Sequence, residues 1–282
     1  MQKSKLGMIA TRRISHGILY AFLIAASFYI IFPFLWMLSA SFKTDAEMFL
    51  FPIKWIPDNL FPVNYIRVWE TLKYGRLLGN TFFITLMVTF LQILTCTLAG
   101  YAFSKINFPE RNKIFLAYLA TLMVPYQVVM IPQFSLIRIM QLTDNPWAII
   151  FIQAFNPFGV FMMRQFFLNI PFDLSEAARI DGLGEFGIYS RIILPLSKPA
   201  IASLLIFTAV NTWNDFLTPM IYINSTSKHT IQLGLRSLFA EFVSDYGAVM
   251  AGATLAILPI FIVFLFLQRF FIEGIATSGI KG

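Results

Sequence analysis

The chain has 282 residues, of which 58% are hydrophobic and 12% are charged, about half the ~25% charged share of a soluble globular domain. Its formal net charge is +7. The composition excludes an ordinary soluble enzyme and indicates that the bilayer is the solvent of this chain.

Apolar runs of membrane-spanning length recur six times along the sequence. About 20 apolar residues cross a ~30 Å hydrocarbon core as a helix, and backbone hydrogen bonds must close within the membrane, so the runs predict helices and not strands. We predict an all-α polytopic membrane protein with a single transmembrane domain over residues 1–282. The six spans are expected at about 16–40, 78–104, 113–138, 147–168, 198–223 and 247–270.

The first span follows a basic lead, as in a signal peptide, but its apolar run is too long for one and five more spans follow. The outer loop 41–77 comes next. Its prolines argue against a long helix early in the loop, while Val63–Leu72 can form a short one. Two roles stay open for the loop: a lid over the outer end of the helix bundle, or a surface for an extracytoplasmic binding protein.

The distribution of basic residues predicts the orientation of the chain. With the N-terminus inside, the inner segments hold most of the 21 Lys and Arg residues. The positive-inside rule then places both termini, and the loop 169–195, in the cytoplasm.

The loop 169–195 carries a pattern that predicts two short helices. Asp173, with Glu176 three residues later, is a variant of the capping box and predicts a helix over about Leu174–Asp181. Gly182 would supply the left-handed turn that ends this helix. A second helix is expected over about Glu185–Ile193 before the chain re-enters the bilayer.

The first of these helices offers a face for another protein. Ala177 and Ala178 would keep one side of the helix flat, so that a partner can approach its backbone closely. The alternative is an amphipathic helix on the membrane surface, which would need a basic polar face. The acids of this loop, Asp173, Glu176, Asp181 and Glu185, disfavour that alternative.

The spacing of the loop resembles the docking loop of ABC importer permeases. Glu176-Ala177-Ala178, three residues, Gly182, nine residues and Ile192-Ile193-Leu194-Pro195 reproduce each element of that signature. Other stretches are similar to the second membrane-spanning subunit of carbohydrate-uptake ABC importers of the maltose and multiple-sugar type. They are Gly100–Lys105, Trp213–Phe216, Gln268–Gly274 and Gly279–Gly282.

This resemblance implies a type I ABC importer permease fold in the inner membrane of a prokaryote. It implies three kinds of partner besides lipid: a second permease subunit, two copies of a cytoplasmic ATPase subunit and an extracytoplasmic solute-binding protein. No nucleic acid is expected as a partner. The residues expected to couple to the ATPase are Asp173, Glu176, Ala177, Ala178, Arg179, Asp181, Gly182, Leu194 and Pro195, and the tail residues Gly279, Lys281 and Gly282 are expected to contact it.

Catalytic motifs are absent from the sequence. It has no G-x-x-x-x-G-K-[ST] phosphate loop, so ATP and Mg are expected on the partner subunits, and no cofactor on this chain. No spacing typical of a metal site or a catalytic triad occurs either, so we expect neither catalytic nor metal-binding residues.

Polar residues inside the fifth span suggest a solute path. Asn211, Trp213, Asn214 and Asp215 would lie in its outer half, where a carboxylate is costly unless it faces water or a partner. Hydrogen bonding between helices is the alternative, and the two stay open. Weaker candidates for the path are Gln127, Gln133, Gln153 and Asn156, and kinks are expected at Pro125, Pro132, Pro157 and Pro219.

Three functions are compatible with these observations. The first is the permease half of a sugar importer. The second is a related ABC permease for another solute, such as glycerol phosphate, a polyamine or phosphate. The absence of Lys and Arg from the central spans favours a neutral solute. The third is an ion-coupled secondary transporter, which would need ionisable residues near the midplane and would leave the docking loop unexplained.

Overall fold

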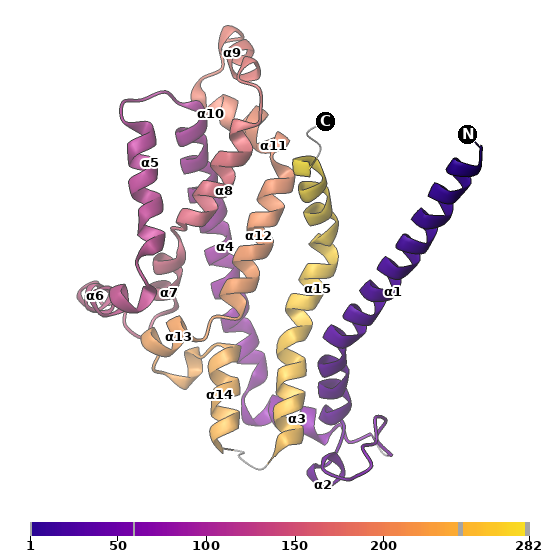
Figure 1. Ribbon diagram of the computed structural model, residues 1–282. Coiled ribbons are helices and arrows are strands. Elements are labelled where there is room, and N and C mark those ends of the chain that lie inside the picture. Colours follow the sequence, from indigo (N-terminus) through magenta and orange to yellow (C-terminus); the bar gives the residue numbers. More distant parts are fainter. Residues whose placement is uncertain (1, 59, 242–244, 280–282) are drawn as a thin grey trace. The chain divides into compact units, whose positions relative to one another are not determined.

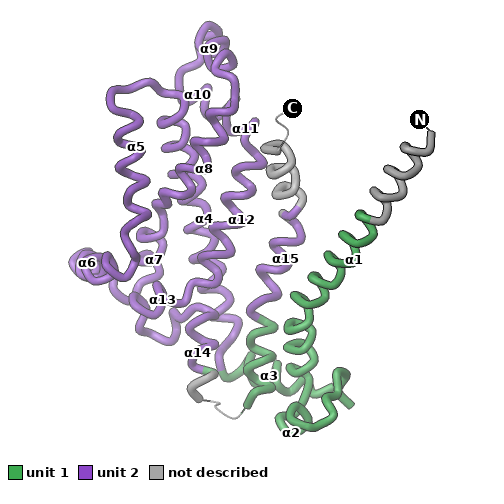
Figure 2. Tube along the Cα trace, in the orientation of Figure 1, with its two compact units in different colours: residues 1–71, 238–255 green, residues 72–237, 256–282 purple. Residues whose placement is uncertain are grey.

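The computed structural model describes residues 2–58, 60–241 and 245–279, and within these ranges the chain forms helices and no strands (Figure 1). The chain divides into two compact units (Figure 2), where the sequence predicts one domain. Unit 1 comprises residues 1–71 and 238–255, and unit 2 comprises residues 72–237 and 256–282. The last helix, α15 (Tyr246–Gly279), belongs to both units.

Unit 1 holds α1 (Gln2–Ser41), α2 (Asp45–Met48), α3 (Val63–Thr71) and the start of α15. Buried Asn64 joins these pieces, because its side-chain amide donates to the carbonyls of Ser41 (3.0 Å) and Lys43 (2.8 Å). Arg67 pairs with Asp245 just before α15. The outer loop is therefore folded against the ends of two long helices, and α3 confirms the short helix predicted over Val63–Leu72.

Unit 2 is built around α4, which packs against α7, α8 and α12. At Gly100 of α4 an added Cβ would lie 2.8 Å from the Met163 Cβ and 3.1 Å from the Arg164 backbone nitrogen of α8, so only glycine allows this approach. The helices up to the long loop are α4 (Tyr74–Lys105), α5 (Arg111–Ala120), η1 (Thr121–Met123), α6 (Tyr126–Ile139), α7 (Pro146–Gln153) and α8 (Pro157–Leu168). Those after it are α12 (Lys198–Trp213), α13 (Leu217–Tyr222), η3 (Thr226–Lys228) and α14 (Ile231–Glu241).

Within the described residues, the helices provide up to six membrane spans by length and composition, if each bent helix pair counts as one. Three single helices are long and apolar enough to cross a membrane: Ser15–Ser41, Tyr74–Lys105 and Tyr246–Phe266. Three further pairs bend at a short break, by 100° for Arg111–Met123 with Tyr126–Ile139, 41° for Pro146–Gln153 with Pro157–Leu168, and 80° for Glu185–Leu196 with Lys198–Trp213. The all-α, six-span fold predicted from the sequence is thereby confirmed.

The breaks fall where proline or a polar residue interrupts the helix. Val124, before Pro125, is extended with ψ 115°, because the proline ring disfavours the helical region for the residue before it. The spans predicted at 113–138 and 198–223, with kinks expected at Pro125, Pro132 and Pro219, are therefore not single helices. In the second of them α12 ends at Trp213, and residues 214–216 separate it from α13.

Two loops of unit 2 lie at opposite ends of α4. Near its start, Asn80 donates to the carbonyls of Ser227 (3.0 Å) and His229 (2.9 Å). At its end, Lys105 donates to the Ile170 carbonyl at 2.6 Å. The loop 169–195 and the loop after α13 are thus on opposite sides, as an alternating six-span path requires; that the former is cytoplasmic stays a prediction.

Candidate functional site

The loop 169–195, here called the coupling loop, folds into a short helix, a left-handed turn and a second helical stretch. The first helix is α9 (Asp173–Ile180), and Gly182 follows with φ +83°. The second stretch runs through α10 (Glu185–Ile188), a π-helical turn η2 (Tyr189–Ile193) and α11 (Leu194–Leu196). The predicted left-handed turn at Gly182 and the predicted second helix are both confirmed.

The start of α9 differs from the capping box predicted at Asp173. The N-cap is Phe172, which already has helical angles, and no side chain caps the helix. Two cations fix the Phe172 ring instead, with the Arg179 guanidinium 5.4 Å and the Lys105 ammonium 5.8 Å from its centroid. Asp173 is therefore a residue of the first helical turn, one position too late to serve as the cap.

The two alanines of α9 lie on different sides of the helix. Ala178 is 3% exposed and belongs to the apolar core with Met163 and Phe167 of α8, whereas Ala177 is exposed. Consecutive residues on a helix cannot share a face, so the prediction that both alanines form one flat docking surface is wrong. Glu176 and Asp181 are exposed like Ala177.

Glu185 joins both parts of the coupling loop to α4. One carboxylate oxygen accepts a hydrogen bond from the Tyr101 hydroxyl of α4 at 2.6 Å. The other oxygen accepts from the Arg179 guanidinium of α9 at 2.9 Å. The hydrogen bond from Tyr101, and then Arg179, hold the pKa of Glu185 below its ordinary value. The sequence pattern marked Tyr101 and Arg179 as parts of motifs but did not single out Glu185 as the residue between them.

Apolar packing fixes the rest of the coupling loop to the helices of unit 2. Ile188 and Ile193 are fully buried, and the Tyr189 hydroxyl is 2.8 Å from the Thr97 hydroxyl of α4. In contrast, Ile180 is 87% exposed and Phe186 is 73% exposed. The loop is thus rigidly attached on one side and presents apolar side chains between acids on the other.

A double-mutant cycle can measure the contribution of the hydrogen bond between Glu185 and Tyr101 to stability. We expect Tyr101→Phe and Glu185→Gln each to destabilise the chain, with a coupling energy of about 1 kcal/mol at pH 7. The lowered pKa of Glu185 means that this contribution is complete above its ordinary value of 4.5 and is lost only as the pH falls through the lower folded-state value. Thermal unfolding of the four proteins in detergent measures the cycle, and additive single effects would contradict the tie.

A polar cavity of about 350 Å³ lies within unit 2, where the spans break. Its walls come from the α7–α8 break, from the α12–α13 break and from α4 and α6. The lining residues are Gln92, Tyr126, Gln133, Ile152, Gln153, Phe155, Asn156, Pro157, Asp215, Leu217 and Thr218. None of them is a lysine or an arginine, so the cavity carries no basic group.

Amides and hydroxyls connect the walls of the cavity. The Gln153 side chain donates to the Asp215 carboxylate at 2.6 Å, and its oxygen accepts from Thr212 at 3.2 Å. The Gln92 oxygen accepts from Asn156 at 3.1 Å and from Thr208 at 2.8 Å. These bonds join α4 and α12 to the residues at the two helix breaks.

The four residues predicted to line a solute path are not all brought together. Asp215 lines the cavity, but Trp213 is 4% exposed and donates to the Ala256 carbonyl at 3.0 Å. Asn214 is exposed and bonds back to the Val210 carbonyl of its own helix, and Asn211 is exposed. Three weaker candidates, Gln133, Gln153 and Asn156, do line the cavity, whereas Gln127 does not.

Gln92 is one of the polar cavity residues that sequence reasoning missed, together with Tyr126 and Thr218. It lies in the middle of an uncharged span, and a single amide there is not distinguishable from a packing residue. The signal that could have found it is its place on α4, the helix that also carries Gly100 and Tyr101. Of the tail residues, Gly279 ends α15, while Lys281 and Gly282 lie outside the described residues.

Up to six apolar spans, a long loop fixed to α4 and α8, and a polar cavity where the spans break are features typical of a membrane transport protein. Residues 10–276 match the model of the family described as binding-protein-dependent transport system inner membrane component, and the chain belongs to this family. It is a permease component of a transport system and a multi-pass protein of the inner membrane.

Relatives that are named as permease proteins of transport systems match nearly the whole chain. It is 36% identical over 259 residues to the arabinooligosaccharides transport system permease protein AraQ of Halalkalibacterium halodurans, covering 91% of this chain and 93% of that protein. It is 32% identical to the lactose transport system permease protein LacG of Rhizobium radiobacter, covering 95% and 97%. A crystal structure of a bacterial ABC transporter involved in the import of alginate, an acidic polysaccharide, superimposes with a TM-score of 0.81 at 25% identity, covering 90% and 96% of the two chains.

Proposed function

We propose that this chain is one permease subunit of an ATP-driven importer for a neutral sugar or oligosaccharide. The arabinooligosaccharide and lactose permeases named above support a carbohydrate as the solute. The observation that supports this proposal best is the coupling loop, which is rigidly tied to α4 and α8 and still exposes an apolar and acidic face.

The exposed face of the coupling loop is the proposed contact with a cytoplasmic ATPase subunit. Ile180 and Phe186 would enter a cleft of that subunit, with Glu176 and Asp181 at the rim. Motion of the ATPase would reach α4 through the bond between Glu185 and Tyr101. ATP and Mg would be bound by two copies of that subunit, and the remaining partners would be a second permease and a solute-binding protein.

Photo-cross-linking tests this contact. A benzoylphenylalanine at position 180 of the full complex, expressed with its co-encoded neighbours, should give an adduct with the ATPase subunit. The matched control is position 51, where Phe51 is 90% exposed in the loop predicted to lie outside. An adduct from position 51 alone would show that the chain has the opposite orientation in the membrane. If position 180 gives no adduct, the coupling loop does not dock on the ATPase subunit.

The polar cavity supports the choice of a neutral solute. Its amides offer both donors and acceptors to hydroxyl groups, and the side-chain oxygen of Gln133 is buried without a protein partner. An acidic sugar would instead favour lysine or arginine on the wall, and none lines the cavity. We propose that Asp215 and the other polar residues of the cavity wall form this subunit's share of the solute path; Asn211, Trp213 and Asn214, which the sequence also suggested, lie outside the cavity lining.

Substitution of Asp215 should show whether the cavity lies on the solute path. Asp215→Ala removes the acceptor for Gln153 and is expected to lower the maximal uptake rate about tenfold, or ~1.4 kcal/mol. Asn214→Ala, one residue away and outside the cavity lining, should change uptake less than twofold. Uptake is assayed in cells that contain equal membrane levels of the two variants. Equal effects of the two substitutions would show that Asp215 contributes to helix packing and not to the solute path.

The tail of the chain is a further proposed contact with the ATPase subunit. Residues Gly279, Lys281 and Gly282 would reach the ATPase interface, as expected from their similarity to the carbohydrate importers. The proposal for Lys281 and Gly282 rests on sequence alone.

A further inference from the structure

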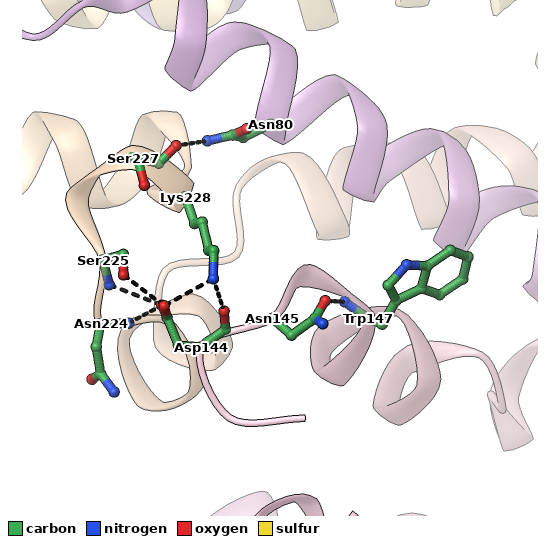
Figure 3. A network of polar contacts seen from close by, with 8 residues as sticks. All are labelled: Asn80, Asp144, Asn145, Trp147, Asn224, Ser225, Ser227 and Lys228. Atoms are coloured by element: carbon green, nitrogen blue, oxygen red, sulfur yellow. Dashed lines mark hydrogen bonds and ion pairs between the residues drawn. The ribbon is translucent and has the colours of Figure 1, made fainter. Parts of the chain in front are cut away.

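Asp144 holds together two chain segments that are about 80 residues apart in the sequence (Figure 3). One carboxylate oxygen accepts from the backbone amides of Asn224 and Ser225, both at 2.9 Å. The other accepts from the Ser225 hydroxyl at 2.6 Å and from the Lys228 ammonium at 2.9 Å. We call this group, Asp144 with Asn224, Ser225 and Lys228, the Asp144 clasp.

The backbone of Asp144 takes part in the same tie. Its amide donates to the Tyr222 carbonyl at 2.9 Å, and its own carbonyl accepts from Lys228. Asp144 has φ +58°, a left-handed conformation that an aspartate adopts only at a cost and that here aims the carboxylate at the other loop. This role could not be predicted from the sequence, because the partners of Asp144 are distant along the chain.

The clasp lies at one end of two short helices. Asp144 stands just before Asn145, the N-cap of α7, and Asn224 follows shortly after the end of α13. At the other end of the same two helices, Gln153 ends α7 and donates to Asp215, which precedes α13. Ile149 and Ile150 of α7 belong to the same buried apolar cluster as Tyr222 and Ile223 at the end of α13.

Together with α7 and α13, these two ties form a closed ring, because they join the two helices at both ends. We infer that α7 and α13 move as one rigid element that forms a wall of the polar cavity, and that Asp144 is the positioning residue that holds this element together. Since Gln153 and Asp215 line the cavity, loss of the clasp at the far end of the helices would let the two residues separate.

The clasp is built to persist over a wide pH range. The hydrogen bonds from Ser225, the Lys228 ammonium and the Asn224 amide hold the pKa of the Asp144 carboxyl well below its usual range. The carboxylate therefore stays charged at neutral and mildly acidic pH, and the clasp serves as a constant tie and not as a pH switch.

Spin labels on the two helices test the inference. Phe151 of α7 and Met220 of α13 are 46% and 43% exposed and can be replaced by cysteines in a Cys96→Ala background. In the complex without nucleotide we expect a single narrow distance between the labels, and in Asp144→Ala a distribution at least twice as broad. Lys228→Met, which keeps the backbone bonds of the clasp, should give an intermediate width and serves as the milder variant if Asp144→Ala does not fold.

Glu110→Gln is the matched control, because it removes the carboxylate of an exposed ion pair with Lys113, at 2.7 Å, elsewhere in unit 2. Its distribution should equal that of the parent. Asp144→Ala and Lys228→Met distributions as narrow as the parent's would overturn the role of the clasp.

A second arm compares the parent complex before and after trapping with MgADP and vanadate. The mean distance between the labels should stay the same, and a change on trapping would show that α7 and α13 do not move as one element. This arm depends on the proposed ATPase partner, whereas the nucleotide-free comparison does not, so failure of the proposed function would leave the test of the clasp intact.

Discussion

Replacement of Gly182 by valine is expected to reduce uptake about tenfold while the chain still inserts in the membrane. Gly182 has φ +83°, and a residue with a Cβ pays roughly 1–2 kcal/mol in the left-handed region, more when it is β-branched. That penalty changes the population of the native loop by a factor of about 5–30. An added Cβ would meet nothing within 4 Å, so the effect would come from the backbone angle alone.

Gly184 provides the matched control for this prediction. It lies two residues further along the same loop, has φ −74°, and an added Cβ there would also meet nothing within 4 Å. Gly184→Val should therefore keep more than half of the parental uptake. Equal loss in both variants, or none in Gly182→Val at equal membrane levels, would show that the turn at Gly182 is not needed for coupling.

The second large effect is expected at the contact of α4 with α8. Gly100→Ala would place a Cβ 2.8 Å from the Met163 Cβ and 3.1 Å from the Arg164 backbone nitrogen, and neither atom is the flexible end of a side chain. Overpacking of this kind costs about 1–3 kcal/mol, so we expect a lower melting temperature in detergent and less of the protein in the membrane.

Gly79→Ala, on the same helix, separates this packing effect from the general effect of alanine in a helix. An added Cβ at Gly79 would meet nothing within 4 Å, and alanine is favoured over glycine in a helix by roughly 0.5–1 kcal/mol. Its melting temperature should equal or exceed that of the parent. If Gly100→Ala is as stable as Gly79→Ala, the close approach of α4 and α8 does not limit stability.

The number of spans could be predicted from the sequence because membrane length and polarity leave few solutions. The breaks within spans were harder to place. Pro125 and Pro157 were expected to produce kinks, but the break after Trp213 has no proline in it. There Asp215 accepts from the amide of Thr218, in the first turn of α13, at 3.1 Å. Local side-chain bonding of this kind is not visible in hydropathy.

The candidate sites were predictable to the extent that they are local. The turn at Gly182 depends on neighbouring residues, and the sequence pattern placed it correctly. The ties of Glu185 to Tyr101 and of Asp144 to Lys228 join residues 84 positions apart, and no spacing rule reaches that far. The prediction that Ala178 lies on an exposed docking face failed for a similar reason. Contacts with α8, which the sequence pattern does not show, decide which face of α9 is buried.

Uptake into proteoliposomes tests whether this chain couples ATP hydrolysis on a partner subunit to sugar import. The chain would be reconstituted with its co-encoded permease, ATPase and binding protein, with MgATP on the ATPase side and radiolabelled arabinotriose, lactose and a uronate oligosaccharide as probes. We expect uptake of a neutral probe that requires MgATP, persists when ion gradients are collapsed and falls about tenfold with Gly182→Val. Uptake driven by an ion gradient without ATP would contradict it.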